Sequence, residues 1–177
     1  MLEPLYLIFP PARRKAVAAL GAIFGGTVLE VGAGTGRNLC YLTEAVGPDG
    51  TVIAVDASAG MLEQAHRLVR TRSWANVQLH QQDAAQLVID RDLDGVLFSL
   101  SYSVLPDPSR ALTLAWEHLR PGGRVVVMDA RLPDNRLGRF LGPAASLLIK
   151  LTPGDPHSRP WEDLEHYGSV DVSRFML

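Results

Sequence analysis

The 177-residue sequence contains a single cysteine, Cys40, no large excess of either charge and no long apolar run. One cysteine excludes an internal disulfide and any zinc site built from several cysteines, which fits a reducing cytoplasm. The formal net charge of -2 provides no broad basic surface for nucleic acid. No stretch approaches the roughly 18 consecutive apolar residues of a membrane-spanning helix. These absences predict a cytoplasmic protein without a nucleic-acid partner.

The composition is that of a folded globular chain, with 47% apolar and 20% charged residues. Its length predicts a single domain over residues 1–177. The apolar run at 5–9 is stopped by Pro10 and Pro11. A basic cluster follows this run instead of preceding it, which is the wrong order for a signal peptide.

Short apolar runs alternate with longer segments of helical periodicity. The runs "VIAV", "GVLF" and "RVVVM" are almost continuously apolar, as in strands buried on both faces of a parallel sheet. Strands are expected at 27–31, 51–55, 77–80, 95–99 and 124–129, and helices at 37–46, 59–72, 108–119 and 135–151. This alternation predicts a doubly wound α/β fold with right-handed crossovers.

The second half of the chain is less regular. "RPGG", at 120–123, is expected to close the helix at 108–119 before the fifth strand. Four prolines within 142–160 predict a break at Pro143 and a loop over 152–160. The alternating "SVDVSRFML", at 169–177, is a candidate sixth strand.

The stretch "VLEVGAGTG", at 28–36, places three glycines at alternate positions directly after an apolar strand. Glycine lets a ligand lie against bare backbone at the carboxyl end of a strand. A phosphate-binding loop would need a Gly-Lys-Ser/Thr ending, which Arg37-Asn38 do not supply. A dinucleotide site prefers G-x-G-x-x-G, but here the third glycine comes one residue early. The pattern E-x-G-x-G-x-G, with Glu30 before the first glycine, fits best.

Two aspartates follow the next two strands. Asp56 stands at the end of the second strand, where its carboxylate can accept hydrogen bonds from both hydroxyls of a ribose. Its alternative role is to cap the helix at 59–72, although Ser58 is better placed for that. Asp83 follows the third strand, where it can accept an adenine amino group; a solvated loop aspartate is an equally good interpretation.

Five motifs, in this order and spacing, resemble class I S-adenosylmethionine-dependent methyltransferases. The motifs are "VLEVGAGTG", "VIAVDASAGML", "QQDAAQL", "DGVLFSLSYSVLPD" and "LRPGGRVVVMDA", and they cover residues 28–130. The group most similar includes the ubiquinone/menaquinone-biosynthesis methyltransferases and small phospholipid N-methyltransferases. The resemblance implies a mostly parallel Rossmann-like sheet, S-adenosylmethionine as methyl donor and S-adenosylhomocysteine as product. It also implies an N-terminal lid or helix over 1–26, a cofactor-binding core over 27–130, and a substrate-side helix and strand over 131–177.

The resemblance carries a set of cofactor-binding roles onto this chain. Glycines and alanine of the turn would line the methionine and ribose portions, Glu30 would support the amino group, and Asp56 would bind the ribose. Met61 would pack on adenine, Asp83 and Ala84 would read the adenine edge, and Ser99 would lie near the methionine moiety. The complete predicted set is Glu30, Gly32, Ala33, Gly34, Gly36, Asp56, Ala57, Met61, Asp83, Ala84 and Ser99.

Several acceptor classes lack their signatures. The Asn/Asp-Pro-Pro-aromatic motif of base amino-methyltransferases is replaced by "SLSYSVLPD". Cytosine C5 methylation needs a cysteine nucleophile, whereas Cys40 lies on the helix expected after the turn and is predicted to face the hydrophobic core. Serines, Ser99 and Ser101, stand where the catechol type has an aspartate ligand for magnesium, so no metal is expected. A small-molecule acceptor, of lipid or quinone type, remains.

The apolar segments at 4–11 and 136–151 are expected to cover the carboxyl end of the sheet. Arg136, Arg139 and Lys150 could contact lipid headgroups at a membrane surface, or could simply be solvated. Tyr102 and Tyr6 are candidate catalytic residues if their hydroxyls lie near the acceptor, and pocket walls otherwise. The family's sheet has seven strands, and no seventh is found in this sequence. The sheet is therefore expected to lack its last strand, and the open edge would suit a homodimer.

Two alternatives to catalysis by methyl transfer stay open. One is a non-catalytic module that keeps the S-adenosylmethionine-binding fold for assembly or sensing. The other is a nicotinamide-dependent oxidoreductase, which the glycine spacing and the lack of a Tyr-x-x-x-Lys pair disfavour.

Overall fold

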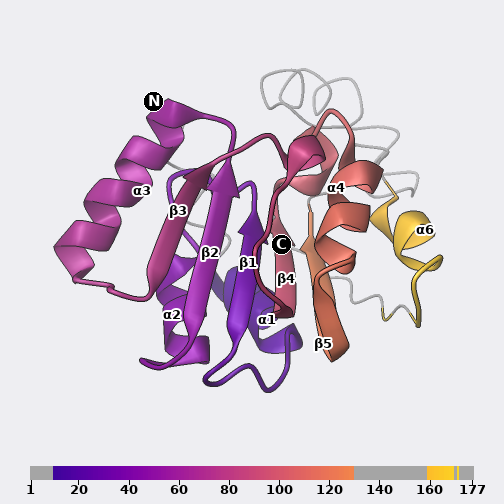
Figure 1. Cartoon of the computed structure of the whole chain (residues 1–177), viewed down its shortest axis with the longest axis horizontal. Helices are drawn as coiled ribbons and strands as arrows, with labels where there is room; N and C mark the ends of the chain where they lie inside the picture. Colours follow the sequence, from indigo (N-terminus) through magenta and orange to yellow (C-terminus); the bar gives the residue numbers. More distant parts are fainter. Residues whose placement is uncertain (1–9, 130–158, 170, 172–177) are drawn as a thin grey trace, which may run out of the picture.

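The structure is a computed structural model that describes residues 10–129, 159–169 and 171. Its centre is a five-stranded, all-parallel sheet in the order β3-β2-β1-β4-β5 (Figure 1). The strands are β1 (Thr27–Val31), β2 (Thr51–Asp56), β3 (Val77–Gln81), β4 (Leu93–Ser99) and β5 (Leu119–Met128). The order reverses between β1 and β4, as in doubly wound folds. The predicted fold class is confirmed.

Helices cover both faces of the sheet. The helices are α1 (Pro10–Ala19), α2 (Leu39–Val46), α3 (Ala59–Arg72), α4 (Pro108–Trp116) and α6 (Pro160–Leu164), with short 3-10 turns η2 (Ala84–Gln86) and η3 (Tyr102–Val104). Alternate residues of each strand point to opposite faces of the sheet and form two hydrophobic cores. On one face Leu29, Val31 and Phe98 pack with α4. On the other face Val28, Ala54 and Leu97 pack with α1 and α2. A strand buried on both faces has no polar side, which is why these runs are continuously apolar.

The N-terminal part of the described chain is a helix packed on the sheet. α1 begins at Pro10, and proline suits the first helical turn because its missing N–H is not needed there. Ala16, Val17 and Leu20 are buried, and the positions three and four residues apart share one face of the helix. The remainder of the expected lid, residues 1–9, lies outside the described residues.

Most predicted boundaries agree with the structure, but the fifth strand differs. The helix expected at 108–119 ends at Trp116, and "RPGG" is part of β5 instead of a turn before it. The pairing shifts from Leu93–Leu119 to Gly95–Arg124, so the extra residues form a bulge. Gly122, with φ +86°, supplies the left-handed backbone of this irregular stretch.

The segment after β5 bears on several predictions. The helix expected at 135–151 lies outside the described residues, and so does almost all of the candidate sixth strand. α6 starts at Pro160, where the loop predicted at 152–160 ends. Leu164 and Tyr167 pack against the α4 side of the core, and Figure 1 shows α6 beside α4.

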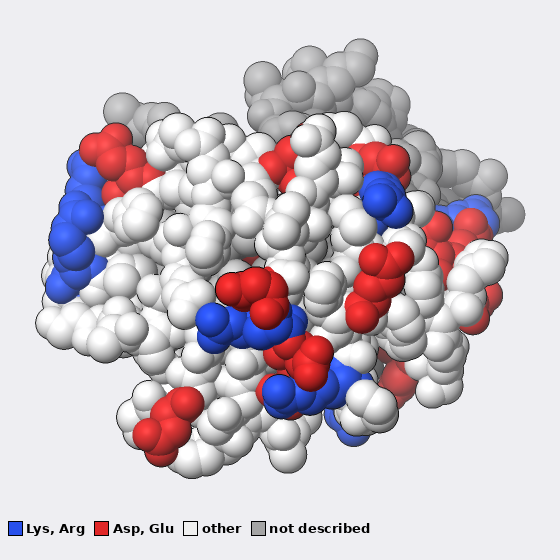
Figure 2. All heavy atoms as spheres, viewed as in Figure 1, with Lys and Arg blue, Asp and Glu red and all other residues white. Residues whose placement is uncertain are grey.

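Charges of both signs are mixed over the face shown in Figure 2. Arg120 pairs with Asp92 and Asp94 near the amino ends of β4 and β5, and Arg67 pairs with Glu63 on α3. Among the helices of the described residues, none is both long and apolar enough to cross a bilayer.

Candidate functional site

The turn after β1 is fixed to the end of β2 by backbone hydrogen bonds. The amides of Gly32 and Ala33 both donate to the carbonyl of Val55, at 2.9 and 3.0 Å. On the other side, the Ser101 hydroxyl donates to the Val31 carbonyl at 2.6 Å. The glycine turn, Asp56 and Ser99 therefore meet at the carboxyl edge of the sheet, where ligands bind in folds of this type.

The three glycines of the turn all have positive φ, but their surroundings differ. A Cβ on Gly32 would lie 2.4 Å from Cβ of Ser101, and one on Gly36 would lie 2.7 Å from Cδ1 of Leu39. A Cβ on Gly34 would meet no atom of residues 10–129, 159–169 or 171 within 4 Å. Gly32 and Gly36 are thus required by packing inside the protein, and only Gly34 presents bare backbone to open space.

Asp56 faces this open position. Its Oδ2 accepts from the Gly34 amide at 2.7 Å and its Oδ1 accepts from the Ser58 amide at 2.8 Å. An ionised carboxylate has about four acceptor positions, so two remain for a ligand. Ser58 is the N-cap of α3, accepting from the Met61 amide at 3.4 Å. The capping interpretation of Asp56 is therefore wrong, because Ser58 occupies that role.

The predicted adenine-side residues lie on the first turns after β2 and β3. Ala57 and Met61 are exposed, and Met61 keeps 45% of its surface accessible, which is unusual for a large apolar side chain. Asp83 is exposed and caps η2, its Oδ1 accepting from the Ala85 amide at 2.9 Å. Ala84 is buried in the core. The cap explains the position of Asp83 without a ligand, while its adenine-binding role stays a prediction.

Glu30 is completely buried on the α1 and α2 side of the sheet. Its Oε1 accepts from Nδ2 of Asn38, and its Oε2 has no hydrogen-bond partner among the described residues. Burial raises the pKa of the Glu30 carboxyl to about 7, although the Asn38 hydrogen bond and the Arg13 charge both lower it. A buried acceptor without a partner costs free energy, so this oxygen marks a position that a donor could complete.

The structure adds Arg13 and Asn38, which the sequence reasoning missed. Arg13 is buried, and its Nη1 donates to Oδ1 of Asn38 at 2.8 Å and to Oγ of Ser99 at 3.4 Å. The sequence did hold a signal, because Arg13 falls three and four residues before Ala16 and Val17, on the buried face of α1. We call Arg13, Glu30, Asn38 and Ser99 the buried polar cluster.

The structure shows the surroundings of Tyr102 and corrects the expectation for Cys40. Tyr102 is buried and its hydroxyl donates to Oδ2 of Asp163 on α6 at 2.6 Å, while its ring packs edge-on against Phe98. Its burial and the Asp163 carboxylate both raise the pKa of this phenol, and its catalytic role stays a prediction. Cys40 is exposed on α2, not in the core, because Leu39 and Leu42 form the buried side of that helix. Tyr6 lies outside the described residues.

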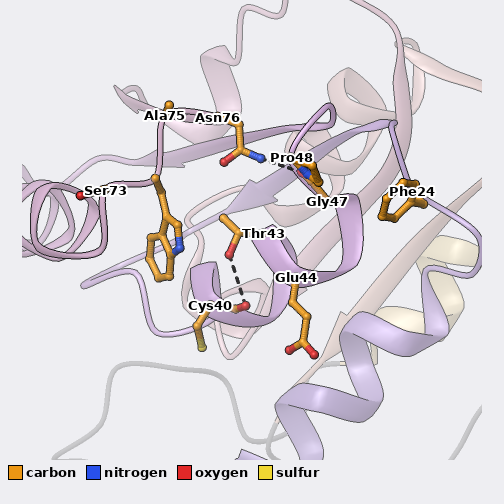
Figure 3. A pocket seen from close by; sticks show the side chains of 10 residues that line it. Phe24, Cys40, Thr43, Glu44, Gly47, Pro48, Ser73, Ala75 and Asn76 are labelled. Atoms are coloured by element: carbon orange, nitrogen blue, oxygen red, sulfur yellow. Dashed lines mark hydrogen bonds between the residues drawn. The ribbon is translucent and has the colours of Figure 1, made fainter.

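An open depression lies away from this site, at the amino ends of β2 and β3 (Figure 3). It is lined by residues of α2 and of the loops before β1, β2 and β3, including Phe24, Glu44, Pro48 and Trp74. It shares no residue with the glycine turn or the buried polar cluster. Within the described part of the chain, no group of three or more histidine, cysteine, aspartate or glutamate side chains could hold a metal ion.

Comparison with known proteins gives a consistent family. Residues 28–123 match the family model described as a methyltransferase domain. The chain is 33% identical to an arsenite methyltransferase of Halobacterium salinarum, over 68% of this chain and 32% of that protein. It is 32% identical to a demethylmenaquinone methyltransferase of Lactococcus lactis, over 68% of this chain and 48% of that protein.

The fold agrees with a solved structure of the same kind. A SAM-dependent methyltransferase from Aquifex aeolicus superposes with a TM-score of 0.60 at 22% identity, covering 75% of this chain and 78% of that one. The chain spans about a third to a half of the length of the curated relatives that it matches.

Proposed function

The chain belongs to the methyltransferase domain family, and from this premise we propose that it transfers a methyl group from S-adenosylmethionine to a small-molecule acceptor. The observation that carries the proposal is the pairing of Asp56 with the Gly34 amide beside open space at the carboxyl edge of the sheet. This arrangement offers bare backbone and a carboxylate with free acceptor positions, which suits a nucleoside.

The described residues fit this cofactor on two counts. A Cβ on Gly34 would occupy space that no atom of the described part of the chain fills, as expected where a ligand approaches the main chain. The unpartnered Oε2 of Glu30, behind the same turn, is an acceptor that a cationic amino group could satisfy. Asp56 would hold the ribose, Glu30 and Ser99 would stand at the amino-acid end, and the exposed Met61 would pack on the adenine.

A sulfonium methyl donor is already activated, so the protein has mainly to position the acceptor. Holding two reactants in line lowers a barrier by as much as about 7–11 kcal/mol, without a covalent nucleophile. The main-chain turn and Asp56 would orient the donor end of the site. The absence of a metal, the cytoplasmic location, contact with a membrane surface and a homodimer stay predictions.

The acceptor is proposed to be a small apolar molecule of lipid or quinone type. The relatives act, by name, on acceptors as different as arsenite and demethylmenaquinone. Trivalent arsenic is a soft centre that several thiolates bind best, and this sequence has one cysteine, Cys40, which is exposed on α2. This argument favours the quinone-like acceptor for the residues present.

Isothermal titration with S-adenosylhomocysteine tests cofactor binding, comparing wild type with Asp56→Asn. This variant loses the charge, and its single carbonyl oxygen can accept from only one of the two backbone amides that Asp56 binds. We expect binding to weaken at least tenfold, since charge-assisted hydrogen bonds contribute about 1.5–3 kcal/mol. Asp107→Asn is the matched control, because Asp107 also accepts from a backbone amide, that of Arg110, at the start of α4.

Failure of the wild type to bind S-adenosylhomocysteine contradicts the proposal. Methyl transfer is then tested by incubating the protein with labelled S-adenosylmethionine and cell extract, with products identified by mass spectrometry. A labelled small apolar product supports the acceptor class. Cofactor binding without any labelled product supports the non-catalytic binding module instead.

A further inference from the structure

The N-terminal helix contributes a buried arginine to the polar cluster behind the glycine turn. Arg13 is 8% exposed, whereas its neighbour Arg14 is exposed and lies over the ring of Tyr41 at 5.6 Å. Taking a guanidinium out of water costs several kcal/mol unless its donors are paired. Arg13 is buried although the next arginine of α1 stays in water. We therefore expect the burial of Arg13 to serve a specific role.

That role is visible in the contacts of Asn38. Its Oδ1 accepts from Arg13 Nη1 at 2.8 Å, and its Nδ2 donates to Oε1 of Glu30. The oxygen and nitrogen of a carboxamide exchange places by a rotation of half a turn. Because Arg13 can only donate, it requires the oxygen on its own side and so places the nitrogen toward Glu30. An ionised Glu30 also requires the nitrogen on its side, but a protonated Glu30 could donate to the oxygen of a reversed Asn38 amide, and Arg13 excludes that orientation in both protonation states.

Arg13 also reaches the second residue assigned to the amino-acid end of the site. Its Nη1 lies 3.4 Å from the hydroxyl of Ser99, on the neighbouring strand β4. One guanidinium from α1 thus contacts the end of β4 directly and the end of β1 through Asn38. The Arg13 charge also lowers the pKa of the Glu30 carboxyl and so helps to keep it ionised.

We propose that Arg13 is a positioning residue of the site: it orients Asn38, and through it the Glu30 carboxylate, to receive the amino-acid end of the ligand. This inference rests on the proposed function, since it assigns α1 a part in recognising the same cofactor. It makes α1 a component of the binding site and not only a cover for the sheet. The adenosine end, held by Asp56 and the backbone at Gly34, is independent of Arg13.

Two probes separate the ends of the site. S-adenosylhomocysteine carries the amino-acid arm, whereas 5′-methylthioadenosine keeps the adenosine and sulfur but lacks that arm. Titration calorimetry of Arg13→Met is expected to show about tenfold weaker binding of S-adenosylhomocysteine and less than twofold change for methylthioadenosine. Arg14→Met is the matched control on the same helix and should change neither affinity. An equal loss for both probes, or no loss for either, overturns the proposal.

A double-mutant cycle tests whether Arg13 acts through Glu30. In the Glu30→Gln background, Arg13→Met should weaken S-adenosylhomocysteine binding clearly less than in the wild type, because the group it positions is gone. Additive effects overturn the proposal. If Arg13→Met does not fold, Arg13→Lys replaces it; lysine keeps the charge but not the planar fork, and should weaken the same probe selectively.

A measurement without ligand distinguishes the two proposals. If the wild type binds neither probe, the proposed function fails. The side-chain amide protons of Asn38 still report on positioning, by nuclear magnetic resonance of the ligand-free protein. They should exchange slowly with solvent in wild type and Arg14→Met, and at least tenfold faster in Arg13→Met. Unchanged exchange in Arg13→Met contradicts the positioning role.

Discussion

At the scale of single residues, the glycines of the turn after β1 divide into two roles. A side chain on Gly32 would meet Ser101, and one on Gly36 would meet Leu39 and Ala65. Glycine is therefore needed at both positions for packing. Gly34 has no neighbour in the described structure at the position that its Cβ would occupy. Within one short motif, glycine is therefore required for core packing at two positions and for the approach of a ligand at the third.

This division predicts opposite phenotypes for Gly34→Ala and Gly36→Ala. In Gly36→Ala the added methyl would overlap Leu39 and approach Ala65 at 3.3 Å, and overpacking of this kind costs about 1–3 kcal/mol. In Gly34→Ala only the left-handed backbone is strained, at about 1–2 kcal/mol, but the methyl projects into the proposed cofactor site. We expect Gly34→Ala to lose S-adenosylhomocysteine binding while remaining folded.

Urea unfolding and titration calorimetry measure the two effects on the same samples. Gly122→Ala, at another positive-φ glycine with no neighbour within 4 Å, controls for backbone strain and should bind ligand normally. Wild-type affinity in Gly34→Ala would show that no ligand lies against this turn.

At the scale of elements, α6 is tied to α4 and η3 by contacts that no sequence motif indicated. Tyr102 donates to Asp163, the hydroxyls of Thr113 and Tyr167 lie 2.6 Å apart, and the rings of Trp116 and Tyr167 are 5.0 Å apart. A helix of five residues has little stability of its own, so tertiary contacts must hold it. Tyr102 is thus part of this attachment.

Tyr102→Phe tests whether the residue attaches α6 or takes part in catalysis. Removing the hydroxyl leaves Asp163 without this donor, and we expect a loss of about 1–3 kcal/mol in unfolding free energy. Methyl transfer at a temperature where the variant is folded should stay within a few-fold of wild type. Thr113→Val, which breaks the hydrogen bond with Tyr167 just after α6, should also lower stability without a large loss of methyl transfer. A hundredfold lower rate in folded Tyr102→Phe alone would support the catalytic interpretation.

At the scale of the whole molecule, the two cores differ in one respect. The α4 side is apolar, whereas the α1 and α2 side contains the buried polar cluster with a completely buried carboxyl group. Burying an ionised carboxylate is costly, so the stability of the entire fold becomes linked to the protonation of Glu30.

The linkage predicts that the protein is less stable at neutral than at mildly acidic pH. The unfolded chain releases this proton near the ordinary pKa of 4.5, and the folded protein releases it only near the raised pKa of about 7. Between these values the folded state binds more protons, so its stability falls as pH rises. The difference between the two pKa values corresponds to about 3 kcal/mol.

Urea unfolding of wild type and Glu30→Gln from pH 4.5 to 8 isolates this contribution from other titrating groups. The wild type should lose about 3 kcal/mol more than Glu30→Gln across the range. Glu44→Gln, an exposed change on α2, should follow the wild type. Identical pH dependence in wild type and Glu30→Gln would refute the linkage.

The sequence by itself determined the positions of the strands, because each strand is a local apolar run. It also located the turn after β1, because the three glycines follow the strand at alternate positions. It placed β1 and α3 at their exact bounds and brought Glu30, Gly34, Asp56 and Ser99 to one edge of the sheet, since parallel strands align their ends. It failed at "RPGG", where the bulge depends on the pairing of β5 with β4.

Only the tertiary structure decided which side chains complete the site. Arg13 is 25 residues from Asn38 and 86 from Ser99 in the chain, and its burial depends on how α1 packs against the sheet. The attachment of Tyr102 to Asp163 and the exposure of Cys40 depend on helix packing in the same way. Sequence periodicity predicts which face of a helix or strand carries a residue. The side chain that it contacts depends on which other element packs against that face.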